Sequence, residues 1–141
     1  GSGKTFLAAI IAQEFIKDLQ SVVFGDVPAL MEELKHTFDK NPQQETSQDI
    51  LDEFKMCDLL VLDDIGAGQI TEWNVGVLYQ IINERYASGK PVIITSNFSP
   101  DELEARLRTK DKHSAERIVS RICGMCEVGN LGDSDRRRKQ W

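Results

Sequence analysis

The segment that most constrains the fold is an apolar run that ends in two acids. Residues 59–62 read Leu-Leu-Val-Leu, and Asp63 and Asp64 follow at once. A strand without polar side chains must be covered on both faces, which is typical of a central strand in a parallel sheet. Helices on both sides of the sheet provide that cover. The segment therefore predicts a layered α/β domain with two carboxylates at the end of a buried strand.

The rest of the chain alternates between helical and strand-like patterns. Apolar residues recur every four positions over residues 5–19, which predicts a helix. Its expected buried stripe is Leu7, Ile11, Phe15 and Leu19. Further helices are expected from Asp26 and Pro28 to about residue 38, after Ser47, over 71–88, from Ser99, and from Ser114 to Gly124. Short apolar runs predict strands at residues 22–24, 91–95 and 125–128, besides the run at 59–62. This alternation indicates an α/β fold with a parallel sheet, in one domain over residues 1–141.

Composition and charge narrow the classes of function. The 141 residues carry a net charge of -6 with a pI of about 4.9, whereas a generic binder of double-stranded DNA is basic. Any contact with DNA must then come from a local patch, from a missing segment or from an assembly. The sequence has no run of ~18 apolar residues, so we expect no membrane span. We expect a cytoplasmic protein.

The three cysteines are too few for a disulfide scaffold, which favours a reducing compartment. Cys123 and Cys126 have the C-x-x-C spacing, but one such pair is only half of a zinc site, and no second pair completes it. A redox pair would open a helix after a strand, whereas this pair closes a predicted helix. We therefore expect Cys57, Cys123 and Cys126 to be small buried residues.

The first five residues, Gly1-Ser2-Gly3-Lys4-Thr5, match the end of the phosphate-binding pattern G-x-x-x-x-G-K-[ST]. In that pattern the backbone N–H groups and the start of the following helix face phosphate oxygens. Lys4 would bring its charge to the β- and γ-phosphates, and the Thr5 hydroxyl would join the Mg²⁺ shell. The first glycine of the pattern would lie before Gly1, so we expect a chain truncated within this loop, after a strand. A cloning remnant that reads Gly-Ser-Gly is the alternative.

Asp63 and Asp64 fit the acidic part of the same site. In P-loop ATPases an acid at the end of a buried strand holds Mg²⁺, which is the role expected for Asp63. The second acid polarises the attacking water, the role expected for Asp64. Solvated acids in a turn are the alternative.

The next predicted strand ends in Thr95-Ser96-Asn97. Ligands of parallel sheets bind at the carboxyl ends of the strands. Asn97 is therefore expected to orient the attacking water through its amide. The alternative is that Asn97 only caps the turn at Ser99-Pro100.

Arginines near the end of the chain leave two interpretations open. Arg117 and Arg121 lie one turn apart on the same face of a predicted helix. They form either a solvated face or an arginine finger that reaches the nucleotide of a neighbouring subunit. Arg136 could reach the phosphates of its own subunit. Residues 137–139 could do the same or could form a basic tail, and the sequence favours neither.

Several segments share the pattern of one family. They are residues 59–67 (Leu-Leu-Val-Leu-Asp-Asp-Ile-Gly-Ala), Thr71-Glu-Trp, Asn83-Glu-Arg-Tyr86, residues 91–97 (Pro-Val-Ile-Ile-Thr-Ser-Asn), 116–122 and 131–136. Together they resemble the AAA+ ATPases of the DnaC/DnaI helicase-loader family and the related IstB transposition ATPases. The resemblance covers nearly the whole chain.

The resemblance implies a P-loop NTPase of the AAA+ type, a three-layer sandwich from which the N-terminal strand and a helicase-binding domain are missing. It implies that ATP is bound by Gly1, Ser2, Gly3, Lys4, Thr5 and Arg136 (sensor II). It further implies Mg²⁺ held by Thr5 and Asp63, and catalysis by Asp64, Asn97 and Arg121, with Arg117 as the less favoured finger.

The function implied by the resemblance is that of an ATP-hydrolysing helicase loader, which acts on a replicative ring helicase and single-stranded DNA and is released by hydrolysis. The protein would form a homo-oligomer in the ATP state. The IstB relatives offer a second function, in which the ATPase targets a transposase to DNA. A nucleotide-sensing module with negligible turnover is a third.

Overall fold

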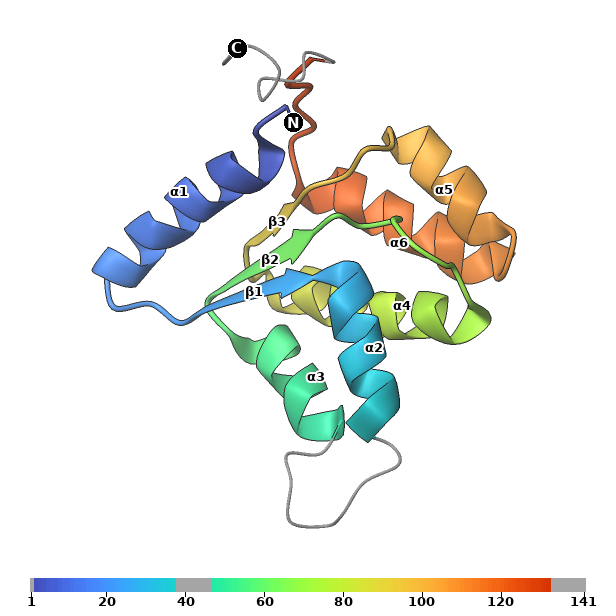
Figure 1. Cartoon of the computed structure of the whole chain (residues 1–141), viewed down its shortest axis with the longest axis horizontal. Helices are drawn as coiled ribbons and strands as arrows, with labels where there is room; N and C mark the ends of the chain where they lie inside the picture. Colours follow the sequence, from blue (N-terminus) through green and yellow to red (C-terminus); the bar gives the residue numbers. More distant parts are fainter. Residues whose placement is uncertain (1, 38–46, 133–141) are drawn as a thin grey trace, which may run out of the picture.

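Figure 1 shows the computed structural model, which describes residues 2–37 and 47–132. Within these residues the strands form one parallel sheet in the order β1-β2-β3. The strands are β1 (Val22–Asp26), β2 (Leu59–Asp63) and β3 (Val92–Ile94). The predicted parallel sheet, with the apolar run as its central strand, is therefore confirmed.

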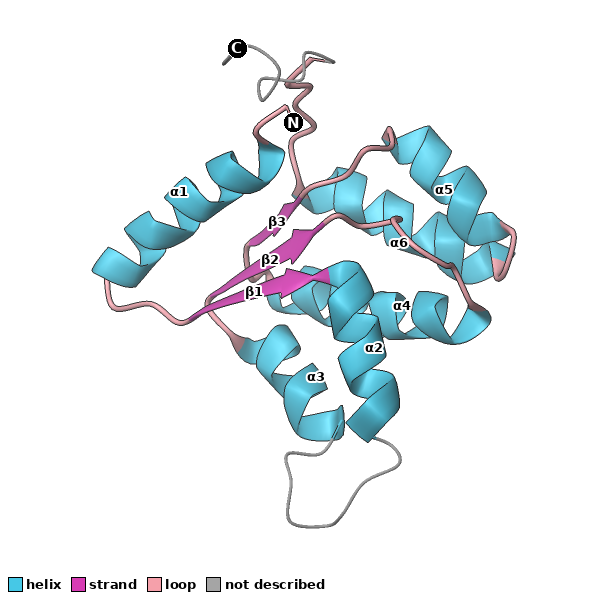
Figure 2. Cartoon of the chain, viewed as in Figure 1, coloured by secondary structure: helices cyan, strands magenta, loops and turns pink. Residues whose placement is uncertain are grey.

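Helices connect the strands and flank the sheet (Figures 1 and 2). Their bounds are α1 (Lys4–Lys17), α2 (Val27–Thr37), α3 (Ser47–Met56), α4 (Glu72–Ser88), α5 (Pro100–Arg108) and α6 (Lys112–Met125). In the part of the chain that the structure describes, no helix has the length and apolar character needed to cross a membrane. The predicted end of the second helix at residue 38 and most of the loop after it lie outside the described residues.

The central strand divides the core into two parts, because its side chains alternate between the two faces of the sheet. Leu59 and Val61 pack with two alanines of α1 on one face. Leu60 and Leu62 belong to a larger cluster on the other face, to which α2, α3, α4, α5 and α6 contribute. Figure 1 shows α1 on one side of the sheet and α2, α3 and α4 on the other. The domain is thus a three-layer α/β sandwich, as expected.

The predicted buried stripe of α1 is confirmed at Phe15, which packs against the same cluster as the two alanines, and is wrong at Leu7, Ile11 and Leu19. Ala8 and Ala12 face the sheet, with 2% and 5% of their surface exposed, because their small side chains allow the helix to approach β2 closely. Leu7 and Ile11 remain 45% and 38% exposed. They line a cavity of about 440 Å³ together with β3. Leu19 lies beyond the end of the helix and is 96% exposed.

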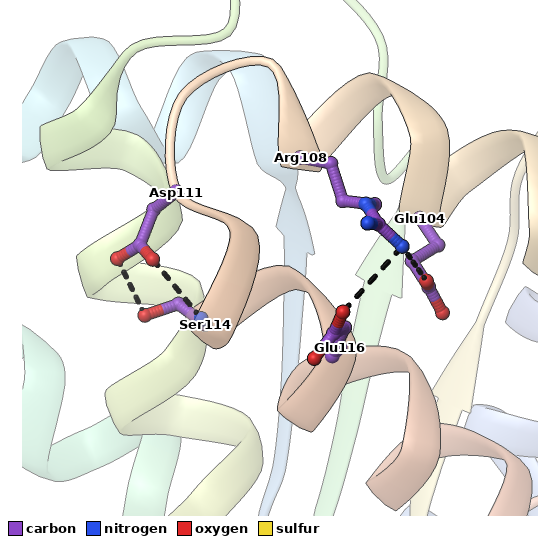
Figure 3. A network of polar contacts seen from close by, with 5 residues as sticks. All are labelled: Glu104, Arg108, Asp111, Ser114 and Glu116. Atoms are coloured by element: carbon purple, nitrogen blue, oxygen red, sulfur yellow. Dashed lines mark hydrogen bonds and ion pairs between the residues drawn. The ribbon is translucent and has the colours of Figure 1, made fainter.

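Polar contacts hold the connection between α5 and α6 (Figure 3). Arg108 Nη1 lies 3.2 Å from Glu104 Oε1 and 3.5 Å from Glu116 Oε1. Asp111 caps α6, because its carboxylate accepts hydrogen bonds from the Ser114 hydroxyl at 2.7 Å and the Ser114 N–H at 3.1 Å. These bonds hold the pKa of Asp111 below its ordinary value. The helix therefore begins at Lys112, two residues before its predicted start.

The strand predicted at residues 125–128 does not form. α6 continues to Met125, and within the described chain the residues after it pair with no strand. A strand requires a hydrogen-bonded neighbour. Residues 125–129 instead line the cavity of about 440 Å³ that Leu7, Ile11 and β3 also line. A cavity therefore lies where this segment would need a neighbouring strand.

The cysteines differ in their exposure. Cys57 is buried and Cys126 is half-buried, and burial raises the pKa of both thiols. Cys123 is exposed. The expected burial of all three cysteines is therefore wrong for Cys123.

Candidate functional site

The first turn of α1 is arranged to receive an anion. Gly3 precedes the helix with φ 91°, in the left-handed region that glycine adopts without strain. No side chain caps this helix start, and none of the residues of its first turn is acidic. Its first N–H groups are therefore available to an outside acceptor, at the positive end of the helix dipole. Lys4 is half-buried beside them and donates to the Ser2 hydroxyl at 2.9 Å.

The end of β2 meets this helix start. The Thr5 hydroxyl lies 3.0 Å from Asp63 Oδ1 and 3.1 Å from Oδ2, although 58 residues separate the two in sequence. Asp63 is only 8% exposed. α1 packs on β2 through its alanines, which fixes the distance between the helix and the strand. The structure thus brings together the basic and the acidic parts of the predicted site.

The second acid has an unusual backbone. Asp64 has φ 62°, a left-handed conformation that aspartate adopts more readily than most residues. Its N–H donates to the Thr95 hydroxyl at 2.9 Å. The Thr95 hydroxyl in turn donates to Asp63 Oδ1 at 2.6 Å. The two acids are therefore tied to each other through a residue that follows β3.

Asn97 completes the cluster. Its Nδ2 lies 3.4 Å from Asp64 Oδ1, and its side chain is exposed. The turn after it is capped by Ser99 and Glu102, each of which accepts the backbone N–H of the other at 3.2 and 2.8 Å. The alternative role of Asn97, as the cap of this turn, is therefore filled by Ser99. The Asn97 amide points to the second acid instead.

Arg106 of α5 supports the loop that follows Asp64. Its Nε donates to the Gly66 carbonyl at 3.0 Å, and its Nη2 lies 3.4 Å from the Gly68 carbonyl. The guanidinium also lies 4.5 Å from the centre of the Phe98 ring. One arginine therefore links the loop after β2 to the segment after β3.

Sequence reasoning assigned no role to Thr95 or Arg106. Thr95 is found from the sheet register of the folded chain, because Leu62 pairs with Ile94 and the next position places Thr95 beside Asp63. Arg106 is found only from the folded chain as well, since its contacts depend on where α5 lies relative to the loop after β2.

A cavity of about 470 Å³ opens beside the cluster. Ser2, Lys4 and Asn97 line it together with residues 128–132. The volume falls in the range of ~300–1,000 Å³ that is usual for small-molecule sites. Lys4 and Asn97 of the cluster thus face a space that can hold a ligand.

The remaining predicted site residues lie elsewhere. The Arg121 guanidinium lies over the rings of Tyr79 and Tyr86, 5.6 and 5.7 Å from their centres, on the side of α6 that packs against α4. Arg117, one turn earlier, is exposed. Arg121 therefore contacts α4, and its Nη1 also lies 3.4 Å from the Arg117 carbonyl of its own helix; these groups lie outside the cluster. Gly1 and Arg136 lie outside the described residues.

Comparisons with known proteins agree with this geometry. The family description "IstB-like ATP binding protein" matches residues 1–141. The "Replicative helicase loader DnaI" of Bacillus subtilis is 33% identical over 143 residues, which cover 97% of this chain and 45% of that protein. This chain thus spans about half the length of that relative.

Solved structures show the same similarity. A structure titled "Crystal Structure of the DnaI" superposes with a TM-score of 0.77 at 35% identity, over 90% of this chain and 66% of that one. A structure titled "Crystal structure of the DnaC helicase loader" gives a TM-score of 0.73 at 30% identity, over 90% of this chain and 71% of that one.

Proposed function

Since the chain belongs to the family of IstB-like ATP-binding proteins and has the fold of the P-loop AAA+ ATPases, we propose that it binds Mg²⁺ and hydrolyses ATP at the cluster around Asp63. The observation that carries this proposal is the contact of the Thr5 hydroxyl with the Asp63 carboxylate, at 3.0 and 3.1 Å across 58 residues. The proposal extends to Lys4, Asp64 and Asn97.

The residues of the helix start fit a triphosphate. Gly3 precedes the helix in a left-handed conformation, no side chain caps the N–H groups of the first turn, and Lys4 adds a positive charge beside them. Backbone N–H groups and a lysine are the usual partners of the β- and γ-phosphates in P-loop proteins. We infer that Lys4 leaves the Ser2 hydroxyl to contact phosphate when ATP binds.

The oxygen donors of Thr5 and Asp63 fit Mg²⁺, which prefers oxygen ligands and keeps several of its waters. When bound, Mg²⁺ neutralises charge on the phosphate oxygens. Thr5 would contact the ion directly, and Asp63 would hold it through water. The hydrogen bond between the two side chains keeps both oxygens at one point of the site.

Asp64 and Asn97 would act on the attacking water. Asp64 is the acceptor for a proton of that water, and the Asn97 amide, 3.4 Å from Asp64 Oδ1, orients it. Asp64 is shorter by one methylene than glutamate, and its left-handed backbone sets the direction in which the shorter side chain projects.

Variants of the full-length protein test the proposal. Lys4→Ala is expected to weaken ATP binding, whereas Lys17→Ala, an exposed lysine on the same helix, should leave it unchanged. Asp64→Asn is expected to retain binding and to lower kcat about 100-fold or more, since it removes the proton acceptor. Wild-type binding and turnover in both Lys4→Ala and Asp64→Asn would reject the assigned site. Absence of turnover in the wild type, with and without single-stranded DNA, would favour a nucleotide sensor instead.

We further propose that the whole protein is a helicase loader. The support is its similarity to a protein named as a replicative helicase loader, at 33% identity. In this proposal ATP favours an assembly that holds single-stranded DNA and keeps a ring helicase open. The second candidate, targeting of a transposase, is supported by the IstB-like family match over residues 1–141. Co-purification with a replicative helicase would separate the two.

Arg121 is proposed to act on the nucleotide of a neighbouring subunit. It would have to leave the rings of Tyr79 and Tyr86 to do so. Arg121→Ala should abolish DNA-stimulated hydrolysis while nucleotide binding persists, and Arg117→Ala is the matched control one turn away. Unchanged turnover in Arg121→Ala would reject the finger. Arg136 is proposed to contact the phosphates within its own subunit.

A further inference from the structure

Thr95 joins the two acids of the site through a single hydroxyl. The residue follows β3 directly and is 7% exposed. Its hydroxyl donates to Asp63 Oδ1 at 2.6 Å and accepts the N–H of Asp64 at 2.9 Å. Both acids therefore depend on one group that follows a different strand.

The direction of these two bonds follows from chemistry. The Asp64 N–H can only donate, so it occupies a lone pair of the Thr95 oxygen. The hydroxyl proton is then free to point at Asp63, where it forms a short bond to a charged acceptor, of the kind that is stronger than a bond between neutral groups. Bonds in such a chain polarise one another. The hydroxyl thus orients the Asp63 carboxylate and the Asp64 backbone together.

Each of the two bonds has a consequence for the proposed chemistry. The bond to Asp63 Oδ1 fixes the rotation of a carboxylate that also faces the Thr5 hydroxyl. The bond from the Asp64 N–H satisfies a donor in a left-handed backbone that aspartate adopts only at a cost. That backbone in turn directs the Asp64 side chain toward Asn97.

We propose that Thr95 is a positioning residue that presets both acids for Mg²⁺ and water before the nucleotide binds. This inference rests on the proposed function. Thr95 touches neither nucleotide nor metal in this proposal, and it acts through Asp63 and Asp64. The methyl group of Thr95 is dispensable for the effect, whereas the hydroxyl is essential.

Two substitutions separate the hydroxyl from the rest of the side chain. Thr95→Val keeps the volume and removes both hydrogen bonds, whereas Thr95→Ser keeps the hydroxyl and removes only a methyl group. Both variants are to be made in the full-length protein. The first measurement is amide hydrogen exchange in the segment that contains Asp64, without nucleotide or metal. The second is a Mg²⁺ titration of the binding of a non-hydrolysable ATP analogue. The third is steady-state hydrolysis.

In Thr95→Val we expect the Asp64 amide to exchange at least about tenfold faster, because it has lost its acceptor. The Mg²⁺ concentration for half-maximal binding should rise about tenfold, and kcat should fall about 10- to 100-fold with KM changed less than about threefold. Thr95→Ser should stay within about threefold of the wild type in all three measurements.

Three results would overturn the assignment. Thr95→Val could match the wild type in amide exchange and Mg²⁺ dependence. Thr95→Ser could be impaired as much as Thr95→Val, which would make the hydroxyl irrelevant. Thr95→Val could lose its folded circular dichroism spectrum or its Mg²⁺-independent ADP binding, which would make the role of Thr95 one in folding. A wild type without turnover or Mg²⁺-dependent binding would reject the proposed function, while the exchange rates would still report on the hydrogen bonds of Thr95.

Discussion

Replacing Arg85 tests how the sheet is held at the end opposite the proposed site. Arg85 lies on α4 and is fully buried, with 0% of its surface exposed. Its Nη1 donates to the carbonyl of Cys57, and its Nη2 donates to the carbonyl of Pro91. Weaker contacts at 3.4 and 3.3 Å reach the carbonyls of Lys55 and Asp58. One guanidinium therefore joins the residues that precede β2 and β3.

The size of the effect follows from these bonds. A hydrogen bond from a charged donor contributes ~1.5–3 kcal/mol, so the two main bonds together contribute roughly 3–6 kcal/mol. Burial of the guanidinium lowers its pKa, which indicates that desolvation offsets part of this gain. We expect Arg85→Met, which fills a similar volume, to lower the free energy of unfolding by about 3 kcal/mol. For a domain of this size that corresponds to a loss of roughly 10 °C in Tm.

The assay is thermal and urea unfolding followed by circular dichroism. Arg85→Lys is the matched control, because it keeps the charge but has no planar fork and cannot reach both carbonyls at once. Its Tm should fall between those of the wild type and Arg85→Met. If Arg85→Met unfolds within about 2 °C of the wild type, the carbonyl bonds add no net stability and the reasoning is wrong.

Three further outcomes are expected. Gly66→Ala should lower the Tm, because Gly66 has φ 86° and a Cβ there would lie 2.7 Å from Leu103 Cδ1; an unchanged Tm would show that the loop adapts freely. The Thr71 hydroxyl caps α4 by accepting the Asn74 N–H at 3.1 Å. Thr71→Ala should therefore lower the free energy of urea unfolding by ~1 kcal/mol, whereas Thr71→Ser, which keeps the hydroxyl, should leave it unchanged. The backbone N–H and hydroxyl of Ser21 hold the pKa of Asp58 below 3.8, so its contribution to stability is complete above that pH and is lost as the pH falls through the lower, folded-state pKa. Asp58→Asn should therefore make stability less dependent on pH below 3.8, and an unaltered dependence would contradict this.

Local patterns were sufficient to predict much of the fold. The apolar run of β2 requires cover on both faces, and the structure places α1 on one face and the other helices on the opposite one. α4 begins after Thr71 and ends at Gly89, whose φ is 67°, as the capping residues predict. These features depend on neighbours in sequence or on a single strand, so a pattern in one segment predicts them.

Features that depend on distant contacts were harder to predict. The larger side chains of α1 suggest a stripe at Leu7 and Ile11, but close packing on β2 selects Ala8 and Ala12. No local pattern distinguishes these two registers, because the apolar residues of α1 surround much of the helix. The strand expected at residues 125–128 also depends on a neighbour that the segment itself does not specify.

Arg85 carries a signal that is visible in retrospect. It continues the buried stripe of Leu78, Ile81 and Ile82 at helical spacing, and all four side chains are buried. An arginine at such a position predicts a set of acceptors within the core. The acceptors themselves, carbonyls before two different strands, become apparent only in the folded chain.

The candidate site also combines features that local motifs predict with features that depend on distant contacts. The proximity of Thr5 and Asp63 follows from motifs at strand and helix ends. The hydroxyl bridge of Thr95 follows only from the register of β2 with β3. A motif indicates which groups the chemistry needs, whereas the sheet register determines which neighbour orients them.

The most direct test is a crystal structure of the full-length protein with a non-hydrolysable ATP analogue and Mn²⁺ in place of Mg²⁺. Anomalous scattering would locate the ion. We predict Mn²⁺ bound by the Thr5 hydroxyl at close to the ~2.0–2.1 Å of a Mg²⁺–oxygen bond, with Asp63 reaching it through water and Lys4 on the phosphates. An ion and triphosphate bound away from Asp63, or a Lys4 ammonium directed away from the phosphates, would contradict the proposed site.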